Sequence, residues 1–476
     1  MVSNCAHRPP RQRHNDIHIE TKRMRYRKYL ERQLEPEAKI VADELQNHSP
    51  WARMIGIPTC GEYELVWSML DSIKLASSRV SPHGRTLCCL LINESATTRV
   101  NYKLANEKLR LAFKDKMEAH FELFDNFKNI SLYADEDLDL LCITRIGSNC
   151  LPQGQGVGLA RKILADVALA LFHHRKLSSQ WIHQTDADAQ IPTDYFDQAM
   201  TYENRDDIAA LVYAFTHTGQ AICDDAEPFD SEVIQTASIL YETWLRYYTL
   251  GLRYAGSPYA FPTIGSTITI NAHAYGMIQG FPKRQAGEDF YLLNKLAKIG
   301  AIEVLNGSPI KLKHRISARV PFGTGKATGK IANLIDTNCP YLVHDPFVFS
   351  AIKSILSYCT DLIEEECDTI DYDQFTKYFP NSIDQTLADI FSLAKDFGIF
   401  NAQYSAMTRA KKKRARLQNF HCWFDSFKTM KFIHLLSQQY IKDIKLEEAI
   451  EKAIFLPIAK SQNPIDTLNH LRNLDD

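Results

Sequence analysis

Short apolar runs alternate with longer amphipathic segments between residues 52 and 188, and this alternation most constrains the fold. The apolar runs are brief and continuous, as in "RTLCCLLIN" at 85–93. The segments between them, such as "YELVWSMLDSIKLAS" at 63–77, place apolar residues at helical spacing. Continuous apolar strands joined by helices are typical of a sheet that is covered on both faces. We therefore predict an α/β domain with a mostly parallel sheet flanked by helices.

The pattern changes twice along the chain, which predicts three parts. Residues 1–47 are rich in charge and are predicted to form a helical N-terminal extension. The α/β domain is predicted to span 48–330, and residues 331–476 have helical spacing throughout, which predicts an α-helical C-terminal domain. A basic run at 409–416, "RAKKKRAR", is expected to be a solvent-exposed helix face or loop.

Composition excludes several classes of protein. The formal net charge is −2 over 476 residues, so no global field favours nucleic acid, and none is expected as a partner. No apolar run approaches the ~20 residues that span a bilayer, so no transmembrane segment is expected. The 11 cysteines are scattered without a C-x-x-C pair, which favours a reducing, cytoplasmic location. Peripheral membrane contact and homo-oligomer formation stay open.

Polar clusters follow three of the predicted strands. They are "PTCGE" at 58–62, "NES" at 93–95 and "TDAD" at 185–188. In parallel sheets, ligands bind at the carboxyl ends of the strands. Asp186 and Asp188 form a D-x-D pair of hard oxygen ligands, which suits Mn²⁺ or Mg²⁺ as a cofactor. The alternative is a solvated acidic turn.

Three further segments carry candidate chemistry. "GQGVGLARK" at 154–162 is a glycine-rich entry to a helix, which suits an anion or is simply a flexible loop. Glu288 and Asp289 lie at the start of another predicted helix. There a carboxylate could act as a general base or could simply interact favourably with the helix dipole. A basic loop at 311–330 could close over a diphosphate. Its His314 is a candidate third metal ligand or phosphate contact, or a structural histidine.

In this order, the strand ends, "GVGLARK", "TDAD", "STITINAHAY" and "IQGFPKRQAGEDF" resemble the family 2 glycosyltransferases with a GT-A, Rossmann-like fold. The likeness is to soluble bacterial-type members and covers about residues 52–320. Gln279 stands where the family has the first glycine of its G-G-F element. The Q-x-x-R-W motif and the membrane helices of the family's synthase branch are missing, so a processive polysaccharide synthase is not expected.

The resemblance implies roles for single residues. Asp289 falls on the catalytic base, with Glu288 beside it, and Asp186 and Asp188 fall on the metal site, to which we add His314. Asn93 and Glu94 stand where the family often has an aspartate that contacts the nucleobase. The identity of the nucleotide therefore stays open. The residues assigned to the donor nucleotide and diphosphate are Pro58, Thr59, Glu62, Asn93, Glu94, Arg161, Asp186, Arg315 and Arg319.

We predict a metal-dependent glycosyltransferase of the hexosyltransferase type. It would move a sugar from a nucleotide-sugar donor to a hydroxyl of a carbohydrate, lipid-linked or small-molecule acceptor. Inversion with Asp289 as base is the expected course, and a retaining course stays open. The alternatives are a nucleotidyltransferase acting on a sugar phosphate and a non-catalytic scaffold that binds a nucleotide sugar.

Overall fold

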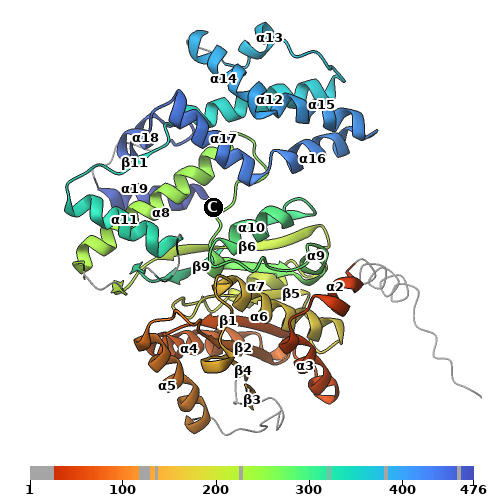
Figure 1. The fold of residues 1–476 in the computed structure, drawn as a ribbon, viewed down its shortest axis with the longest axis vertical. Coiled ribbons are helices and arrows are strands. Elements are labelled where there is room, and N and C mark those ends of the chain that lie inside the picture. The colour runs from red at the N-terminus through yellow and green to blue at the C-terminus, as the bar shows by residue number, and fades with distance from the viewer. Residues whose placement is uncertain are drawn as a thin grey trace, which may run out of the picture. The chain divides into compact units, whose positions relative to one another are not determined.

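The computed structural model divides into two compact units (Figure 1). The first unit comprises Met1–Phe215 and Ile264–Lys311, and the second comprises Thr216–Thr263 and Leu312–Asp476. The residues that the structure describes are 26–116, 129–134, 138–224, 229–317, 319, 321, 323–379, 384–457 and 463–475. Residues 1–25 of the predicted helical extension lie outside them, as do parts of the predicted loop at 311–330.

The first unit is built on an eight-stranded, mostly parallel sheet with the order β3-β4-β2-β1-β5-β8-β6-β9. β4, β2, β1 and β5 are parallel, whereas β3 and β8 run antiparallel to their neighbours β4 and β5. β1 and β2 are buried at every position, which explains their continuous apolar sequence. The strands are β1 (Arg53–Thr59), β2 (Thr86–Asn93), β3 (Ile130–Ala134), β4 (Asp139–Arg145), β5 (Trp181–Gln184), β6 (Ile208–His217), β8 (Ile268–Asn271) and β9 (Ala301–Leu312).

Helices flank this sheet in two groups. α4 contacts α5 and α7, whereas α6 contacts α3 and α9. The chain moves from β1 through α4 to β2, and it returns through α6 to β5 on the other side of β1, so right-handed connections place α4 and α6 on opposite faces. The helices are α2 (Arg27–Arg32), α3 (Pro36–Glu44), α4 (Tyr63–Arg79), α5 (Val100–Lys116), α6 (Gly156–His173), α7 (Tyr195–Met200), α9 (Ala272–Met277) and α10 (Glu288–Leu296).

A buried polar network joins the start of the described chain to α6. Asp166 is fully buried and accepts hydrogen bonds from the Tyr29 hydroxyl and the Lys162 ammonium, both at 2.5 Å. The backbone N–H of Glu35 donates to the same carboxylate at 2.9 Å. Lys162 follows Arg161 directly in the sequence. Its ammonium group nevertheless bonds to Asp166 on another face of α6, in a structural contact.

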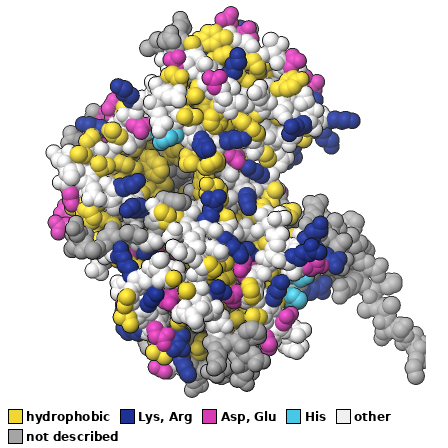
Figure 2. Space-filling model, in the orientation of Figure 1, with side chains coloured by type: hydrophobic (Ala, Val, Ile, Leu, Met, Phe, Trp, Pro, Cys, Tyr) yellow, Lys and Arg dark blue, Asp and Glu magenta, His cyan; other side chains and the backbone are white. Residues whose placement is uncertain are grey.

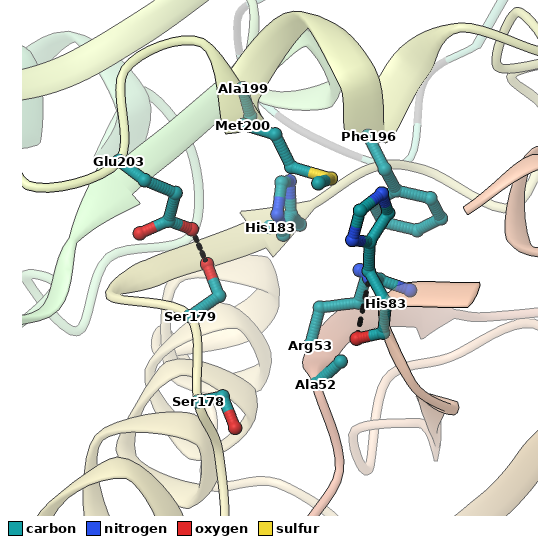
Figure 3. A pocket seen from close by; sticks show the side chains of 10 residues that line it. All are labelled: Ala52, Arg53, His83, Ser178, Ser179, His183, Phe196, Ala199, Met200 and Glu203. Atoms are coloured by element: carbon teal, nitrogen blue, oxygen red, sulfur yellow. Dashed lines mark hydrogen bonds between the residues drawn. The ribbon is translucent and has the colours of Figure 1, made fainter. Parts of the chain in front are cut away.

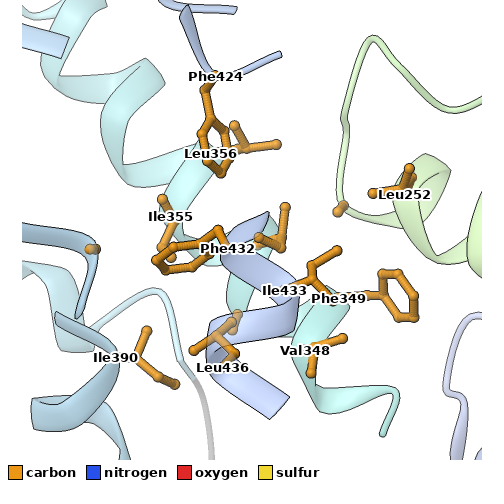
Figure 4. Close-up of a cluster of buried hydrophobic side chains, with 14 of the residues drawn as sticks. Leu252, Val348, Phe349, Ile355, Leu356, Ile390, Phe424, Phe432, Ile433 and Leu436 are labelled. Carbon is orange, nitrogen blue, oxygen red and sulfur yellow. The ribbon is translucent and has the colours of Figure 1, made fainter. Parts of the chain in front are cut away.

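The second unit is almost entirely helical, as predicted for the C-terminal region. Its apolar core includes Phe349, Phe432 and Leu436, all fully buried (Figure 4). Its strands pair in twos: β7 (Ile222–Cys223) with β10 (Arg315–Ile316), and β11 (Leu342–Val343) with β12 (Ile444–Lys445). The helices are α8 (Ser231–Tyr254), α11 (Thr324–Asp336), α12 (Phe347–Glu364), α13 (Tyr372–Thr376), α14 (Asp384–Phe397), α15 (Ile399–Arg409), α16 (Lys413–Trp423), α17 (Ser426–Gln439), α18 (Leu446–Lys452) and α19 (Pro464–Asp475).

The α/β prediction is thus confirmed, while the boundaries at 47 and 330 stay predictions. Grouping by contacts assigns 216–263, which supply α8, and 312–330 to the helical unit.

Two surface properties bear on function. Cationic and anionic side chains are intermixed on the face shown in Figure 2, which agrees with a net charge near zero. Among the described helices, none is both long enough and apolar enough to cross a membrane.

Candidate functional site

The three predicted polar clusters follow strands that end at one edge of the sheet. β1 ends at Thr59, β2 at Asn93 and β5 at Gln184, and the pairing of β1 with both neighbours is parallel. The order of connections reverses between β1 and β5, which is where open α/β sheets bind ligands. The D-x-D pair begins two residues after the end of β5 and so lies at this point.

Arg161 of α6 connects the D-x-D pair to the start of α10. Its Nη2 donates to Asp186 Oδ1 at 2.6 Å, and its Nε donates to Glu288 Oε1 at 3.0 Å. The guanidinium is only 3% exposed, and its bond to Glu288 is shielded from solvent, whereas the Asp186 side chain is 35% exposed. Two carboxylates about one hundred residues apart in sequence are therefore held by one cation.

The backbone around Arg161 is shaped to admit it. A Cβ added at Gly265 would lie 2.4 Å from Arg161 Nη2, so this position has no room for a side chain. Gln184 Nε2 donates to the Arg161 carbonyl at 2.9 Å and ties α6 to the end of β5. Gly287 precedes Glu288 with φ +70°, a conformation that glycine adopts at little cost.

The site carries more negative than positive charge. Burial raises the pKa of Asp186 to about 6, against the opposing charge of Arg161 and with the support of Asp188 and Glu62. Burial likewise raises the pKa of Asp289 to about 7, and the neighbouring Glu288 adds to this effect. The pKa of Arg161 rises because the nearby carboxylates outweigh the opposite effect of its burial. An additional positive charge, such as a bound cation, would therefore stabilise the ionised carboxylates of this cluster.

One donor of Arg161 has no acceptor. Nη1 is buried and has no hydrogen-bond partner within the described residues, although Nε and Nη2 are both bonded. Buried charged donors are nearly always satisfied in native proteins. The position therefore suits an oxygen acceptor that the described part of the chain does not supply.

The other predicted residues at this edge organise its loops. Glu62 Oε2 accepts from the backbone N–H of Cys60 at 3.2 Å and from the Thr59 hydroxyl at 3.3 Å. Glu94 Oε1 accepts from the backbone N–H of Gly147 at 2.7 Å. Pro58 lies within β1, next to Leu91 of β2. These contacts fix the loop shapes and leave the predicted nucleotide contacts as predictions.

Three predicted residues belong to the second unit instead. Arg315 pairs with Asp224 at 2.7 Å, and Arg319 lies 3.8 Å from the same carboxylate. His314 stacks on His217 with 6.3 Å between ring centroids, and burial lowers its pKa to about 4. Their roles toward a metal or a diphosphate stay predictions.

The donor set at the D-x-D pair suits a metal only in part. Within the described ranges, no group of three or more histidine, cysteine, aspartate or glutamate side chains is placed to hold a metal ion. Asp186 and Asp188 supply two carboxylates, and Mg²⁺ is commonly bound by one or two carboxylates together with waters and substrate phosphates. The residues therefore fit a cation that arrives with a phosphate-bearing ligand.

Two important residues had no signal in the sequence. Asn106 of α5 accepts from the backbone N–H of Gly61 at 2.8 Å and donates to the Asn93 carbonyl at 3.0 Å, so it links the ends of β1 and β2. Gly265 makes room for Arg161. Neither lies in a motif, because each acts through contacts between segments remote in sequence.

Comparisons with known proteins leave the family open. No protein-family profile matches the chain, and no curated protein sequence matches it. Similar solved structures include residues 1–349 of S. aureus TarS, in complex with UDP-GlcNAc and alone. Identities are 10% and 11%, each alignment covers 82% of this chain and 92% or 91% of TarS 1–349, and the TM-scores are 0.34 and 0.32. Overlaps this loose carry no argument about function.

Proposed function

We propose that the chain is a glycosyltransferase that uses a nucleotide-sugar donor, with a site built around Arg161. The observation that carries the proposal is the double contact of Arg161 with Asp186 and Glu288 at the carboxyl edge of the sheet. This contact supports the resemblance to family 2 at its two most informative motifs, the D-x-D pair and the E-D pair. The finer assignments, including family 2 membership and a hexosyl group, belong to the same proposal.

In this proposal, Asp289 is the general base. It accepts the proton of the acceptor hydroxyl as that oxygen attacks the anomeric carbon from the face opposite the leaving group, which gives inversion. A base works best when its pKa lies near the working pH, and burial places that of Asp289 at about 7. Glu288 is held by Arg161 and keeps the negative charge beside Asp289 that sustains the raised pKa.

Arg161 holds the two carboxylate motifs in register and offers Nη1 to a donor phosphate oxygen. Such a bond would satisfy the buried donor and stabilise the charge that develops on the leaving nucleoside diphosphate. Asp186 and Asp188 would hold Mn²⁺ or Mg²⁺ together with that diphosphate. The cation, when bound, would neutralise part of the diphosphate charge.

The test measures nucleoside diphosphate release from a panel of nucleotide sugars, with Mn²⁺ or with a chelator, for the full chain. We expect metal-dependent release with at least one donor. Asp289→Asn should lower the rate by about 10² to 10⁴ and should remove a rise in rate with pH through about 7, because only the ionised carboxylate accepts a proton.

Donor binding is measured separately by thermal shift, since a ligand of the native state raises its stability. Asp188→Ala should lose the Mn²⁺-dependent shift, whereas Asp207→Asn, an exposed aspartate of the same unit, should keep it. Pyrophosphate release from a nucleoside triphosphate and a sugar phosphate would indicate the nucleotidyltransferase instead. Binding without turnover would indicate the scaffold, and the absence of both would refute the transferase.

A further inference from the structure

The first unit contains a cavity at the amino ends of β1 and β5, at the edge of the sheet opposite the Arg161 site. Its volume is about 170 Å³, which is smaller than the 300–1,000 Å³ that is usual for drug-sized ligands and suits a single small ring. It is lined by Ala52, Arg53, His83, Ser178, Ser179, His183, Phe196, Ala199, Met200 and Glu203 (Figure 3).

Opposite charges line this cavity without pairing. Arg53 and Glu203 lie on either side of His183 in Figure 3, and neither a hydrogen bond nor an ion pair joins them within the described residues. His183 is uncharged at neutral pH, because its burial and the nearby Arg53 guanidinium lower its pKa to about 3. The two charged side chains therefore oppose one another: a small anion would meet the Glu203 carboxylate, and a cation would meet Arg53.

Both charged groups are already partly satisfied. Arg53 Nη1 donates to the Gly84 carbonyl at 3.1 Å and to the Thr86 hydroxyl at 3.3 Å, and Glu203 Oε1 accepts from the Ser179 hydroxyl at 2.5 Å. Arg53 Nη2 also donates to the His83 carbonyl at 3.5 Å, so Arg53 cannot offer the free pair of Nη1 and Nη2 donors that a bidentate carboxylate or phosphate prefers. Single hydrogen bonds remain available, and hydroxyl groups both donate and accept them.

The wall formed by α7 is apolar. Phe196 and Met200 project from this helix toward the cavity, with His183 of β5 between the two charged walls (Figure 3). His183 Nδ1 is bonded to the Thr269 hydroxyl at 3.0 Å, and the ring also packs against Phe196. Phe196 is only 1% exposed and the Arg53 guanidinium lies 5.6 Å from its ring centroid, so Met200 supplies most of the accessible apolar wall. A small apolar surface thus lies beside isolated hydrogen-bonding groups, as a sugar ring with one apolar face requires.

We propose that this cavity binds one neutral monosaccharide, at a site separate from the donor site of the proposed transferase. The hydroxyls of the sugar would donate to Glu203, and its apolar face would lie against Met200. The site has no part in the transfer step, so the two proposals stand independently.

The test is saturation-transfer NMR on the full chain with D-glucose, D-galactose, D-mannose and N-acetylglucosamine, and with glycine and inorganic phosphate as charged competitors. At least one sugar should bind, and neither competitor should displace it. Met200→Trp fills the cavity and should weaken sugar binding by at least about tenfold, equivalent to the loss of about 1.4 kcal/mol. Asp188→Asn, at the other edge, should leave this binding unchanged.

The second part of the test removes the negative charge of the cavity. Glu203→Gln keeps the shape and removes the negative charge, so sugar binding should weaken and phosphate should begin to bind beside Arg53. Glu64→Gln, with a carboxylate 81% exposed on α4, is the matched control and should alter neither. The proposal is overturned if no sugar binds, if glycine or phosphate binds better to the wild type, or if Met200→Trp binds sugar normally. Nucleoside diphosphate release, measured on the same samples, reports separately on the transferase.

Discussion

The charge clusters around Arg161 in the first unit and around Glu242 in the second have opposite balances. In the first unit, Arg161 is the single cation among several carboxylates, and the pKa of Asp289 is raised. In the second unit, Glu242 of α8 is fully buried and is bonded by three positively charged or protonatable side chains. These are His217 at 2.9 Å, Arg246 at 3.0 Å and Arg472 at 2.9 Å.

The difference separates a structural cluster from a candidate functional one. Burial alone would raise the pKa of Glu242, but hydrogen bonds from His217 and Arg472 and the charge of Arg246 lower it well below its usual range. That cluster is satisfied by the protein itself, and it ties α19 to α8. The Arg161 cluster has excess negative charge and, among the residues that the structure describes, no acceptor for Nη1, so it has room for a ligand that the Glu242 cluster lacks.

The largest effect is expected at Glu242. Glu242→Ala removes the buried carboxylate that Arg246 and Arg472 share, which should destabilise the packing of α19 on α8 by about 3–5 kcal/mol. Hydrogen exchange of peptides from both helices measures this change. Because the carboxylate pKa is lowered by folding, the wild-type contribution should be present above about pH 4 and lost as the pH falls below it. A loss under 1 kcal/mol would remove the distinction between the clusters.

The Arg161 cluster should respond in the opposite direction. The folded state holds the Asp289 proton up to about pH 7, whereas the unfolded chain releases it near pH 4, so stability from this group falls between these values. Asp289→Asn should therefore stabilise α6 and α10 by up to about 4 kcal/mol at pH 8 and by almost nothing at pH 4. Hydrogen exchange at both pH values measures it, and a destabilised variant at pH 8 would contradict the charge balance.

A steric change tests the same cluster without a change of charge. Gly265→Ala places a methyl group 2.4 Å from Arg161 Nη2, which should cost about 1–3 kcal/mol and should weaken donor binding with it. Gly329→Ala, in α11 of the second unit, meets only Ile316 Cγ2 at 3.2 Å and is the matched control. Equal thermal shifts for the two variants would show that Arg161 can move freely.

The smallest effect is expected for a surface pair. Lys452 and Glu448 of α18 lie 2.7 Å apart one helical turn from each other, but their side chains are 52% and 46% exposed. Glu448→Gln should leave the midpoint of thermal unfolding almost unchanged, in contrast to Glu242→Ala in the same unit. A larger loss would show that burial is not what separates these carboxylates.

The sequence alone determined the class of fold and the positions of the polar strand ends. Continuous apolar runs such as 85–93 have one stable environment, a sheet covered on both faces, so the α/β architecture follows from local pattern. Parallel pairing then implies that Asp186 and Thr59 lie toward the same edge. Glu288 and Asp289 were found as a motif, although nothing local showed what they contact.

Only the tertiary structure decided how these parts meet. It showed that Arg161 joins Asp186 to Glu288, that Gly265 makes room for the guanidinium, and that 216–263 group with the helical region. It also showed that Glu242, unremarkable in sequence, is the centre of a satisfied charge cluster. The physical reason is that spacing along a chain encodes periodic burial, whereas the pairing of charges depends on which distant side chains share one poorly solvated volume.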